Sequence, residues 1–454
     1  MGKQLVAIVG AEHVRDDPGA LEAYSRDATP LFRHKPDFVC SPGSTAEIQE
    51  VLKLAGETQT PVTVRGAGTN LSAATVPQLG GIVLVMTRMN RLLEIDTANL
   101  VAVTQPGVPT ARLADAAAAK GLLYPPDPGS RTTSTIGGNV GTCAGGLRGL
   151  KYGVTRDYVL GCEAVLGTGE VIRCGGKLVK DVAGFDLLRL LCGSEGTLAV
   201  ITELTLRLVP APASYGVGLA YFETLAQAGA AVSRVLADGV LPATLEFLDA
   251  TCIRTVEDYA KVGLRRDAGA LLIFGQDGDA QTVHTDLESM SATCRDEGAI
   301  DVRLARDERE TQSLLEARRA VLPSLSRLAP LTILEDATVP RSRLAEMVER
   351  IEQIAVRHDL LVGTFGHAGD GNLHPTCVVD PEQPGALERV EAAFAEIFAA
   401  ALELGGTVTG EHGIGLAKKK FLADQLGDAQ LALLRRIKSA FDPATILNPG
   451  KLGS

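Results

Sequence analysis

Two hydrophobic spacings alternate along the second half of this chain. Short apolar runs at 269–276 (GALLIFGQ) and 331–340 (LTILEDATVP) predict β-strands. Longer segments at 341–358 (RSRLAEMVERIEQIAVRH) and 386–406 (ALERVEAAFAEIFAAALELGG) place apolar residues every three or four positions and predict amphipathic helices. Helices and strands mixed in this way predict an α+β domain.

The first half combines strands and helices with an unusual glycine content. Residues 41–55 predict a helix capped by Ser44 or Thr45, and the runs at 81–86 (GIVLVM) and 100–107 (LVAVTQPG) predict strands. Residues 121–200 contain 17 glycines among short strands. Glycine at that density within β structure indicates a backbone that lies close to something flat or bulky.

Proline marks a domain joint near the middle of the chain. Pro210 and Pro212 stand one residue apart, where the glycine-rich pattern gives way to alternating strands and helices. We therefore predict one domain over 1–210, a second over 211–404, and a C-terminal segment over 405–454 that completes the active site and packs back on the first domain.

Charge and cysteine usage narrow the classes of function. The formal net charge of −11 argues against a nucleic-acid partner, which requires clustered Lys and Arg. The apolar run at the N-terminus is too short for a signal peptide, and no window reaches the ~18 apolar residues of a membrane span. The eight cysteines are scattered, without iron–sulfur or haem spacing, and suit reduced thiols. We expect a cytoplasmic protein, at most peripheral to a membrane through a partner, with no second redox centre of its own.

The loop at 64–73 (VRGAGTNLSA) favours anion binding. Gly66 and Gly68 lack the third glycine of a Rossmann fingerprint, and no clear helix follows. Arg65, the small residues and the hydroxyls of Thr69 and Ser72 can present several donors to a pyrophosphate. An ordinary tight loop is the alternative interpretation of this stretch alone.

Several long motifs together carry a family resemblance. They are RGAGTNLSA (65–73), PPDPGS with TIGGNVGTCAGG and KYG (125–153), VKDVAGFDLLRLLCGSEGTLAVITELTLRLVP (179–210) and FDPATILNPGKL (441–452). In this order they resemble the FAD-linked oxidases of the vanillyl-alcohol-oxidase superfamily, in the glycolate, D-lactate and D-2-hydroxyglutarate dehydrogenase branch. The resemblance implies a PCMH-type FAD-binding domain of two subdomains, followed by an α+β substrate (cap) domain with an antiparallel sheet.

The resemblance also implies which residues bind FAD. The pyrophosphate loop has no histidine, so we expect the flavin to be non-covalent. The implied FAD-binding residues are Arg65, Gly66, Ala67, Gly68, Thr69, Asn70, Leu71, Ser72, Pro126, Asp127, Gly137, Gly138, Asn139, Gly141, Thr142, Gly145, Gly146, Glu195, Gly196, Ile201 and Asn448.

A second candidate site begins in the stretch 363–375 (GTFGHAGDGNLHP). His367 and His374 are seven apart, and on one continuous strand they would face opposite sides of the sheet. The Gly-Asp-Gly between them can reverse the chain and bring them together. Glu411 in GGTVTGEHGIG (405–415) offers a third ligand, and two histidines with one carboxylate suit Zn²⁺, Mn²⁺ or Fe²⁺. Buried histidines satisfied by hydrogen bonds are the alternative.

The family's metal ligands fall on the same three residues, and its catalytic base falls on His412. The side chain of His412 suits that role because imidazole exchanges protons near neutral pH. The family's carboxylate-binding arginine falls on Arg318, whereas the adjacent Arg319 is equally consistent with a solvated helix face. Leu322 and Leu334 stand where relatives that handle a dicarboxylic acid have threonine and lysine. This difference favours a substrate with a short or apolar side chain.

The resulting prediction is an FAD-dependent dehydrogenase that oxidises a D-2-hydroxy acid, D-lactate or glycolate-like, to the 2-oxo acid. The metal would clamp the substrate, His412 would take the hydroxyl proton, and the hydride would pass to flavin N5. The electron acceptor is then external: an iron–sulfur subunit, an electron-transfer flavoprotein, a quinone or oxygen. We expect a homodimer or a subunit of a complex. The alternatives are a metal-free flavin oxidase of alcohols or amines, and a flavoprotein subunit of a multi-subunit glycolate oxidase, either active or catalytically idle.

Overall fold

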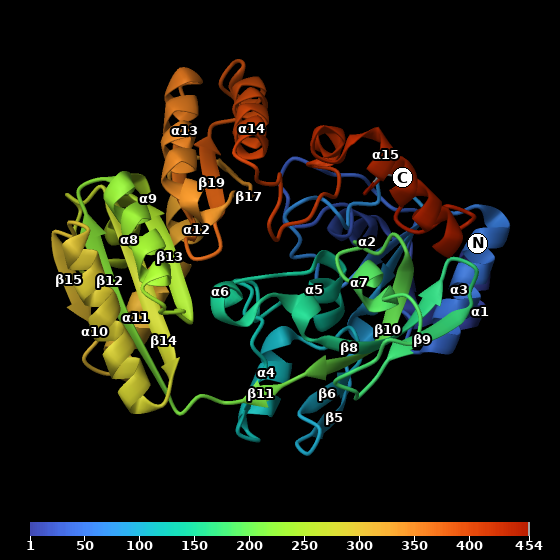
Figure 1. The fold of residues 1–454 in the computed structure, drawn as a ribbon. Helices are drawn as coiled ribbons and strands as arrows, with labels where there is room; N and C mark the ends of the chain where they lie inside the picture. The colour runs from blue at the N-terminus through green and yellow to red at the C-terminus, as the bar shows by residue number, and fades with distance from the viewer. Residues whose placement is uncertain (453–454) are drawn as a thin grey trace. The chain divides into compact units, whose positions relative to one another are not determined.

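The computed structural model describes residues 1–452 and divides into two compact units. The first unit contains Met1–Ala144, Val154–Ala211 and the chain from Glu411 onward, and the second contains Gly145–Gly153 and Pro212–Gly410. Figure 1 shows the helices and strands of both units along the chain. Helices and antiparallel sheets are mixed, so the predicted α+β class is confirmed.

The first unit holds two sheets. The four-stranded sheet has the order β1-β2-β4-β3, in which the last three strands are parallel. Its strands are β1 (Val14–Arg15), β2 (Phe38–Cys40), β3 (Val62–Arg65) and β4 (Ile82–Val85), and it packs with α1 (Gly2–Val9) and α3 (Thr45–Thr58). The predicted cap of the helix is confirmed, because Ser44 Oγ accepts the backbone N–H of Glu47 at 3.2 Å.

The five-stranded sheet has the order β5-β6-β10-β8-β9 and is antiparallel throughout. It contains β5 (Leu92–Asp96), β6 (Val101–Thr104), β8 (Val159–Leu166), β9 (Val171–Gly175) and β10 (Ala199–Arg207). Lys177, just after the edge strand β9, forms ion pairs with Glu94 at 2.7 Å and Asp96 at 2.9 Å on the opposite edge strand β5. The chain just after one edge strand therefore lies within a lysine side chain's reach of the other edge strand.

The remaining helices and strands complete the first unit. They are α2 (Pro18–Ala23), α4 (Thr110–Ala118), β7 (Leu122–Leu123), α5 (Ile136–Thr142), α7 (Leu187–Leu191), β11 (Val209–Pro210), α15 (Leu422–Phe441) and single 3₁₀ turns at Ala11–His13, Met86–Arg88, Thr155–Asp157 and Lys419–Phe421. The C-terminal tail joins this unit beside the parallel sheet, where Asn448 donates its backbone N–H to the carbonyl of Val62.

The second unit is built on one antiparallel sheet of eight strands. Its order is β15-β12-β14-β13-β18-β19-β16, with β17 also paired to β19. The strands are β12 (Ser214–Phe222), β13 (Thr244–Asp249), β14 (Ala270–Gly278), β15 (Asp301–Leu304), β16 (Leu331–Leu334), β17 (Ala337–Thr338), β18 (Leu361–His367) and β19 (Asn372–Val379). The predicted strand at 331–340 is thus two strands, interrupted at Glu335 and Asp336, because Asp336 turns away to bind the loop at 409–410.

Helices cover this sheet. They are α8 (Leu225–Ala237), α9 (Ala250–Ala260), α10 (Ala280–Asp296), α11 (Glu308–Arg319), α12 (Val321–Leu325), α13 (Leu344–Arg357) and α14 (Ala386–Glu403), with a 3₁₀ turn at Arg341–Arg343. Leu219, Leu248 and Phe365 share one apolar cluster with α9, α11 and α12. Gly216 is three residues from Leu219 on β12 and so points to the other face of the sheet, where it faces Val283 and Leu287 of α10. The alternation along each strand therefore sorts the helices between the two faces.

The short segment 145–153 joins the second unit through one ionic cluster. It contains α6 (Gly149–Tyr152), and Lys151 Nζ lies 2.5 Å from Asp277 Oδ1 while donating to Gln276 Oε1 at 2.9 Å. Tyr152 donates its hydroxyl to the other oxygen of Asp277 at 2.8 Å. Among the helices of residues 1–452, none is long and apolar enough to cross a lipid bilayer.

Candidate active site

The two histidines of the 363–375 stretch lie on a β-hairpin. Strand β18 ends at His367, and residues 368–371 turn the chain into β19. His367 pairs with Asn372, so His374 lies two residues further along the partner strand, on the same face. The two imidazole rings are 5.2 Å apart, nearly perpendicular, and only 7% and 4% exposed. The predicted chain reversal is confirmed, and the two side chains converge.

The turn requires glycine at its last position. Gly371 has φ +79°, and a Cβ there would lie 2.1 Å from the carbonyl oxygen of Val339. A side chain at this position would therefore both strain the backbone and push the turn away from the neighbouring chain.

Glu411 follows Gly410, whose backbone is held by a hydrogen bond within the second unit. Asp336 Oδ2 accepts the backbone N–H of Gly410 at 2.7 Å, and a Cβ on Gly410 would meet Thr338 Oγ1 at 2.2 Å. One ligand atom from each of His367, His374 and Glu411 lies within 4.8 Å of the others. Two imidazoles and a carboxylate at this spacing fit a divalent cation in donor type and number.

Glu246 is the residue that organises this site, and the sequence patterns did not single it out. It lies on β13 directly opposite His367 on β18. Its Oε1 is 2.7 Å from Nδ1 of His367, and its Oε2 accepts from Nε of Arg318 at 2.6 Å. With Nδ1 engaged by the carboxylate, Nε2 is the ring nitrogen of His367 that can bind a metal ion.

The charge of Glu246 is maintained by its two partners. The side chain is 1% exposed, and this burial alone would raise its pKa, but His367 and Arg318 outweigh burial and hold the pKa below its ordinary value. The residue therefore sits as an anion between two groups that can each carry positive charge.

Arg318 and Arg319 have different environments. Arg318, at the end of α11, is 8% exposed, and its guanidinium lies 4.7 Å from the centre of the Phe365 ring. Arg319 is exposed. Of the two, Arg318 is the buried cation next to the histidines, with donors beyond the Nε that Glu246 occupies. Leu322 on α12 and Leu334 at the end of β16 are partly buried.

The proposed pyrophosphate loop in the first unit is built over a buried arginine. Arg65 donates from Nη1 to the carbonyl of Arg26 at 2.7 Å, and burial lowers its pKa. Gly68 has φ +77°, and a Cβ there would lie 2.0 Å from the Arg65 guanidinium. A Cβ on Gly66 would meet Thr135 Oγ1 at 2.2 Å. The glycines therefore let this loop approach both the arginine and the segment 135–142.

Two further segments of the first unit close around that loop. Gly196 has φ +68° and packs on Val64, whose strand leads into the loop. Glu195 accepts the backbone N–H groups of Ile414 at 2.6 Å and Gly415 at 2.8 Å. Burial raises the pKa of Glu195 despite these bonds. Its carboxylate thereby anchors the loop that carries His412, and it points to protein backbone.

Three asparagines expected to bind FAD also bond to protein. Asn70 accepts the backbone N–H groups of Ser72 and Ala74 and donates to the carbonyl of His412 at 3.2 Å. Asn139 donates to Thr110 Oγ1 at 2.8 Å. Asn448 donates to the carbonyls of Ala74 at 2.9 Å and Glu195 at 2.6 Å. These side chains therefore hold the loops of the first unit together.

The other predicted FAD-binding residues divide between the units. Ala67, Thr69 and Leu71 are partly buried in the same loop, and Ser72 is buried. Gly137, Gly138, Gly141 and Thr142 form α5, and a Cβ on Gly141 would meet open space. Pro126 and Asp127 precede it, and Ile201 lies on β10. Gly145 and Gly146 belong to the segment of the second unit.

This arrangement suits a bound dinucleotide. The loops 65–72, 135–142 and 193–196 come together in the first unit, and Gly66, Gly68 and Gly137 among them leave no room for a side chain. Residues 66–71 are partly exposed, and the buried guanidinium of Arg65 lies against Gly68. Close-packed backbone with a positive charge beneath it is the environment that a pyrophosphate requires.

The sequence held one signal for Glu246. It is the only charged residue of the apolar run 243–248 (ATLEFL), on a strand buried at every position. A carboxylate in such a strand needs a cationic partner, because an unpaired buried charge is costly. That pattern indicates a paired carboxylate, although it does not identify the partner.

Comparison with known families decides the identity of the chain. The family of FAD linked oxidases, C-terminal domain, matches residues 211–452, and an FAD binding domain matches residues 36–175. The chain belongs to the FAD-linked oxidase family. It is therefore a flavoprotein oxidoreductase, and the predicted cofactor FAD is confirmed at the level of the domain.

Curated relatives of this FAD-linked oxidase span nearly its whole length. Glycolate oxidase subunit GlcD of Bacillus subtilis is 51% identical over 99% of this chain and 96% of its own. Glycolate oxidase subunit GlcD of Escherichia coli is 38% identical over 94% of this chain and 86% of its own. D-lactate dehydrogenase of Archaeoglobus fulgidus is 40% identical over 95% of each chain. The branch suggested by the motifs is thus confirmed.

Solved structures confirm the fold of the oxidase. p-Cresol methylhydroxylase with substrate bound has a TM-score of 0.83 at 17% identity, covering 99% of this chain and 96% of that one. 4-Ethylphenol oxidase from Gulosibacter chungangensis has a TM-score of 0.81 at 21% identity, and the match covers 99% of this chain and 95% of that one. The PCMH-type architecture is therefore shared although few residues are.

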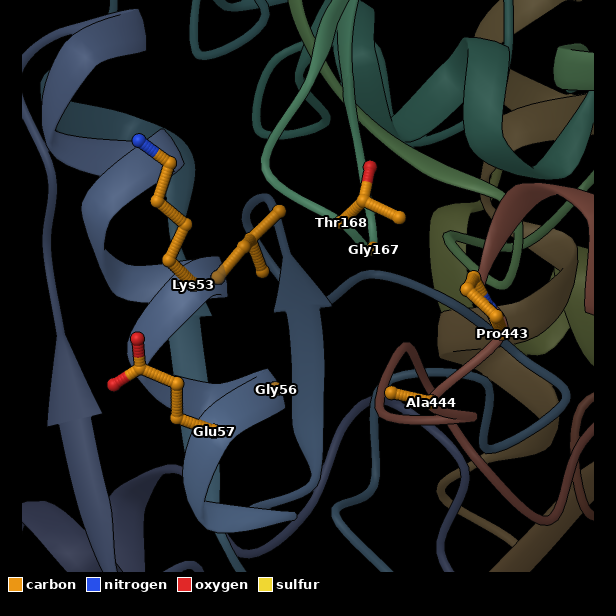
Figure 2. Close-up of a pocket in the computed structure, with 8 residues that line it drawn as sticks. Lys53, Gly56, Glu57, Gly167, Thr168, Pro443 and Ala444 are labelled. Atoms are coloured by element: carbon orange, nitrogen blue, oxygen red, sulfur yellow. The ribbon is translucent and has the colours of Figure 1, made fainter.

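A pocket elsewhere in the first unit contains none of the candidate residues. Figure 2 shows it between α3, the turn from β8 to β9, and the chain that follows α15. It is lined by Leu52, Lys53, Gly56, Glu57, Gly167, Thr168, Pro443 and Ala444. This pocket is therefore separate from the candidate active site, which is identified by the contacts among His367, His374, Glu246 and Arg318.

Proposed function

We propose that this FAD-linked oxidase is a dehydrogenase of a D-2-hydroxy acid, glycolate- or D-lactate-like, which it converts to the 2-oxo acid. The observation that carries the proposal is the buried trio of Arg318, Glu246 and His367 beside His374. It brings one buried cation, one buried carboxylate and two imidazoles together, which supports roles in binding a carboxylate and a metal ion. The named relatives, which include glycolate oxidase subunits and D-lactate dehydrogenases, support this substrate class.

Each side chain has one role in the proposal. The guanidinium of Arg318 binds the substrate carboxylate through the N–H groups that Glu246 does not use. His367, His374 and Glu411 would hold a divalent Zn, Mn or Fe ion, which lowers the pKa of the substrate hydroxyl when bound. Bound FAD supplies the acceptor for the hydride.

His412 takes the hydroxyl proton in this proposal. Its loop is fixed by Glu195 from one side and by Ser72 from another, since the Ser72 carbonyl accepts the backbone N–H groups of Leu416 and Ala417. A base held by a rigid loop needs little reorganisation when it accepts a proton. Glu195 thus acts through His412 as a positioning residue.

The specificity would follow from the apolar character of the surroundings. Leu322 and Leu334 cannot pair with a second carboxylate, so glycolate, D-lactate or a somewhat larger D-2-hydroxy acid is preferred over a dicarboxylic acid. Electrons would leave through an external acceptor: an iron–sulfur subunit, an electron-transfer flavoprotein, a quinone or oxygen. The word "subunit" in two relatives' names favours a multi-subunit complex over a homodimer.

Anaerobic bleaching of the bound flavin tests the proposal directly. The purified holoprotein is mixed with glycolate, D- and L-lactate, longer D-2-hydroxy acids, D-2-hydroxyglutarate, and simple alcohols and amines. Rapid bleaching by the short D-acids or glycolate, with slow bleaching by L-lactate and D-2-hydroxyglutarate, is expected. Bleaching by alcohols or amines alone would contradict it. No bleaching by any acid would instead favour an idle flavoprotein subunit.

Metal analysis separates the proposal from a metal-free oxidase. One equivalent of Zn, Mn or Fe per chain is expected, and chelation should abolish flavin bleaching by the acid while FAD stays bound. Full activity in a metal-depleted protein would exclude the proposed clamp.

A further inference from the structure

A pair of cysteines lies across two neighbouring strands of the five-stranded sheet. Cys162 on β8 and Cys174 on β9 are directly opposite in the antiparallel register, and their Sγ atoms are 3.5 Å apart. In the order of the sheet, β8 lies between β10 and β9. Cross-strand neighbours at this spacing already have Cα and Cβ separations that suit a disulfide.

The surroundings make one of these thiols reactive. Strand β9 is an edge strand, and Cys174 is only partly buried, whereas Cys162 is 7% exposed. The neighbouring Cys162 thiol lowers the pKa of Cys174, and Cys174 raises that of Cys162. A partly exposed thiol of lowered pKa next to a second thiol is the arrangement in which a first oxidation is followed by disulfide closure.

Glycines lie beside both cysteines. Cys174 is followed by Gly175 and Gly176, both with positive φ, and Gly161 precedes Cys162. The sulfur atoms must approach by roughly 1.5 Å to reach a bond length of about 2.05 Å. A small rotation of each side chain at such a glycine-flanked edge supplies this movement.

We propose that Cys162 and Cys174 form a reversible disulfide when the protein meets a peroxide. The Cys174 thiolate attacks one peroxide oxygen, which breaks the O–O bond and leaves a sulfenic acid. The Cys162 sulfur then displaces that hydroxyl as water, forming the S–S bond. Two thiols and one hydrogen peroxide thereby give one disulfide and two waters. The bond would join the edge strand β9 covalently to β8 until a dithiol reduces it.

Non-reducing tryptic mapping of the holoprotein tests this proposal. After hydrogen peroxide treatment and blocking of the remaining thiols, cleavage after Arg156, Arg173 and Lys177 should yield residues 157–173 linked to 174–177. If Arg173 is not cut, residues 157–177 should appear two hydrogens lighter. Dithiothreitol should reverse either product.

Variants sharpen the test. Cys174→Ser should abolish the linked peptide, whereas Cys294→Ser, which removes a buried thiol on α10, should leave it unchanged. The rival is the pair Cys143 and Cys192, two buried cysteines whose thiols also interact, and their link would join residues 132–148 to 190–207. That link in place of the first, or sulfenic acid at Cys174 without closure, or no oxidation at either residue, would overturn the proposal.

Discussion

Glu246 and His367 face each other across β13 and β18, with carboxylate oxygen and ring nitrogen 2.7 Å apart. The same carboxylate holds Arg318 with its second oxygen at 2.6 Å. One buried anion therefore orients both the residue proposed to bind the substrate carboxylate and a residue proposed to bind the metal. A change at Glu246 should affect both functions, although it touches neither ligand directly.

Replacement of this carboxylate by an amide tests that coupling. Glu246→Gln keeps the shape but removes the charge that orients the ring of His367, so metal affinity should fall roughly 10- to 100-fold. Metal titration of the apoprotein measures this, and KM for the acid should rise with it. Glu349→Gln, on an exposed part of α13, is the matched control. Unchanged metal affinity in Glu246→Gln would show that His367 needs no such orientation.

The neighbouring arginines should differ in effect. Arg318→Lys loses the planar fork beside Phe365, and KM for the hydroxy acid should rise roughly 10- to 100-fold, the equivalent of one or two charge-assisted hydrogen bonds. Arg319→Lys should leave KM unchanged because its side chain is exposed. Stopped-flow flavin reduction over a range of substrate concentrations gives both values. Equal effects at the two positions would argue against Arg318 as the carboxylate ligand.

Removal of the proposed base should act on the rate and leave binding intact. His412→Ala should lower the limiting rate of flavin reduction by about 10²- to 10⁴-fold, the usual contribution of a general base, with metal and FAD content unchanged. His34→Ala, an exposed histidine, is the control. Near-wild-type flavin reduction with every acid tried would eliminate His412 as the base.

Glu195 should matter through the loop it anchors. Glu195→Gln can accept only one of the two backbone N–H groups of Ile414 and Gly415, and an unmet buried donor costs about 1–3 kcal/mol. Hydrogen exchange in a peptide covering 411–417 should therefore accelerate, and flavin reduction should slow. Glu57→Gln, an exposed residue on α3, should change neither. Unaltered exchange would mean that other contacts fix the loop.

Lys451 gives a pH dependence of stability. Burial lowers its pKa to about 7, despite the opposing attraction of Asp27 and Glu195. Between that value and the ordinary lysine pKa of about 10.4, the unfolded chain binds a proton that the folded chain does not, so stability rises with pH. This contribution is complete above about pH 10.4 and is lost as the pH falls from there to about 7.

Unfolding midpoints at pH 6, 7, 8 and 9, values chosen to bracket that pKa, provide the measurement. The midpoint of the wild-type protein should rise with pH relative to Lys451→Met, which has no titrating amine. The exposed Lys3→Met variant should follow the wild type. Parallel curves for the wild type and Lys451→Met would show that the buried amine keeps its ordinary pKa.

Local sequence patterns predicted which helices and strands form, but they did not predict where a strand is interrupted. The amphipathic segments 341–358 and 386–406 form α13 and α14, and the Gly-Asp-Gly turn forms the hairpin. The run 331–340 was wrongly predicted to be one strand, because Asp336 serves a loop distant in sequence. No periodicity reports a contact made across 74 residues of chain.

In the candidate site, too, local features could be predicted and contacts between distant parts of the chain could not. His367, His374, Glu411, His412 and Arg318 could be named from residue type, glycine context and family motifs, because these are local in the chain. Glu246 could not be assigned a role, since its partners lie 121 and 72 residues away. Residues expected to touch FAD, such as Glu195 and Asn70, direct their side chains to protein backbone, which only the packed loops determine.

By itself, the sequence determined the α+β class, the flavin family and the residue types available for acid oxidation, since spacing and motif are properties of the chain. The tertiary structure decided which of those residues meet. It placed His367 and His374 on one face through the register of a hairpin, and it placed Glu246 between His367 and Arg318 through strand pairing and a helix end. A buried charge is stable only beside its counter-charges, and the fold alone brings them together.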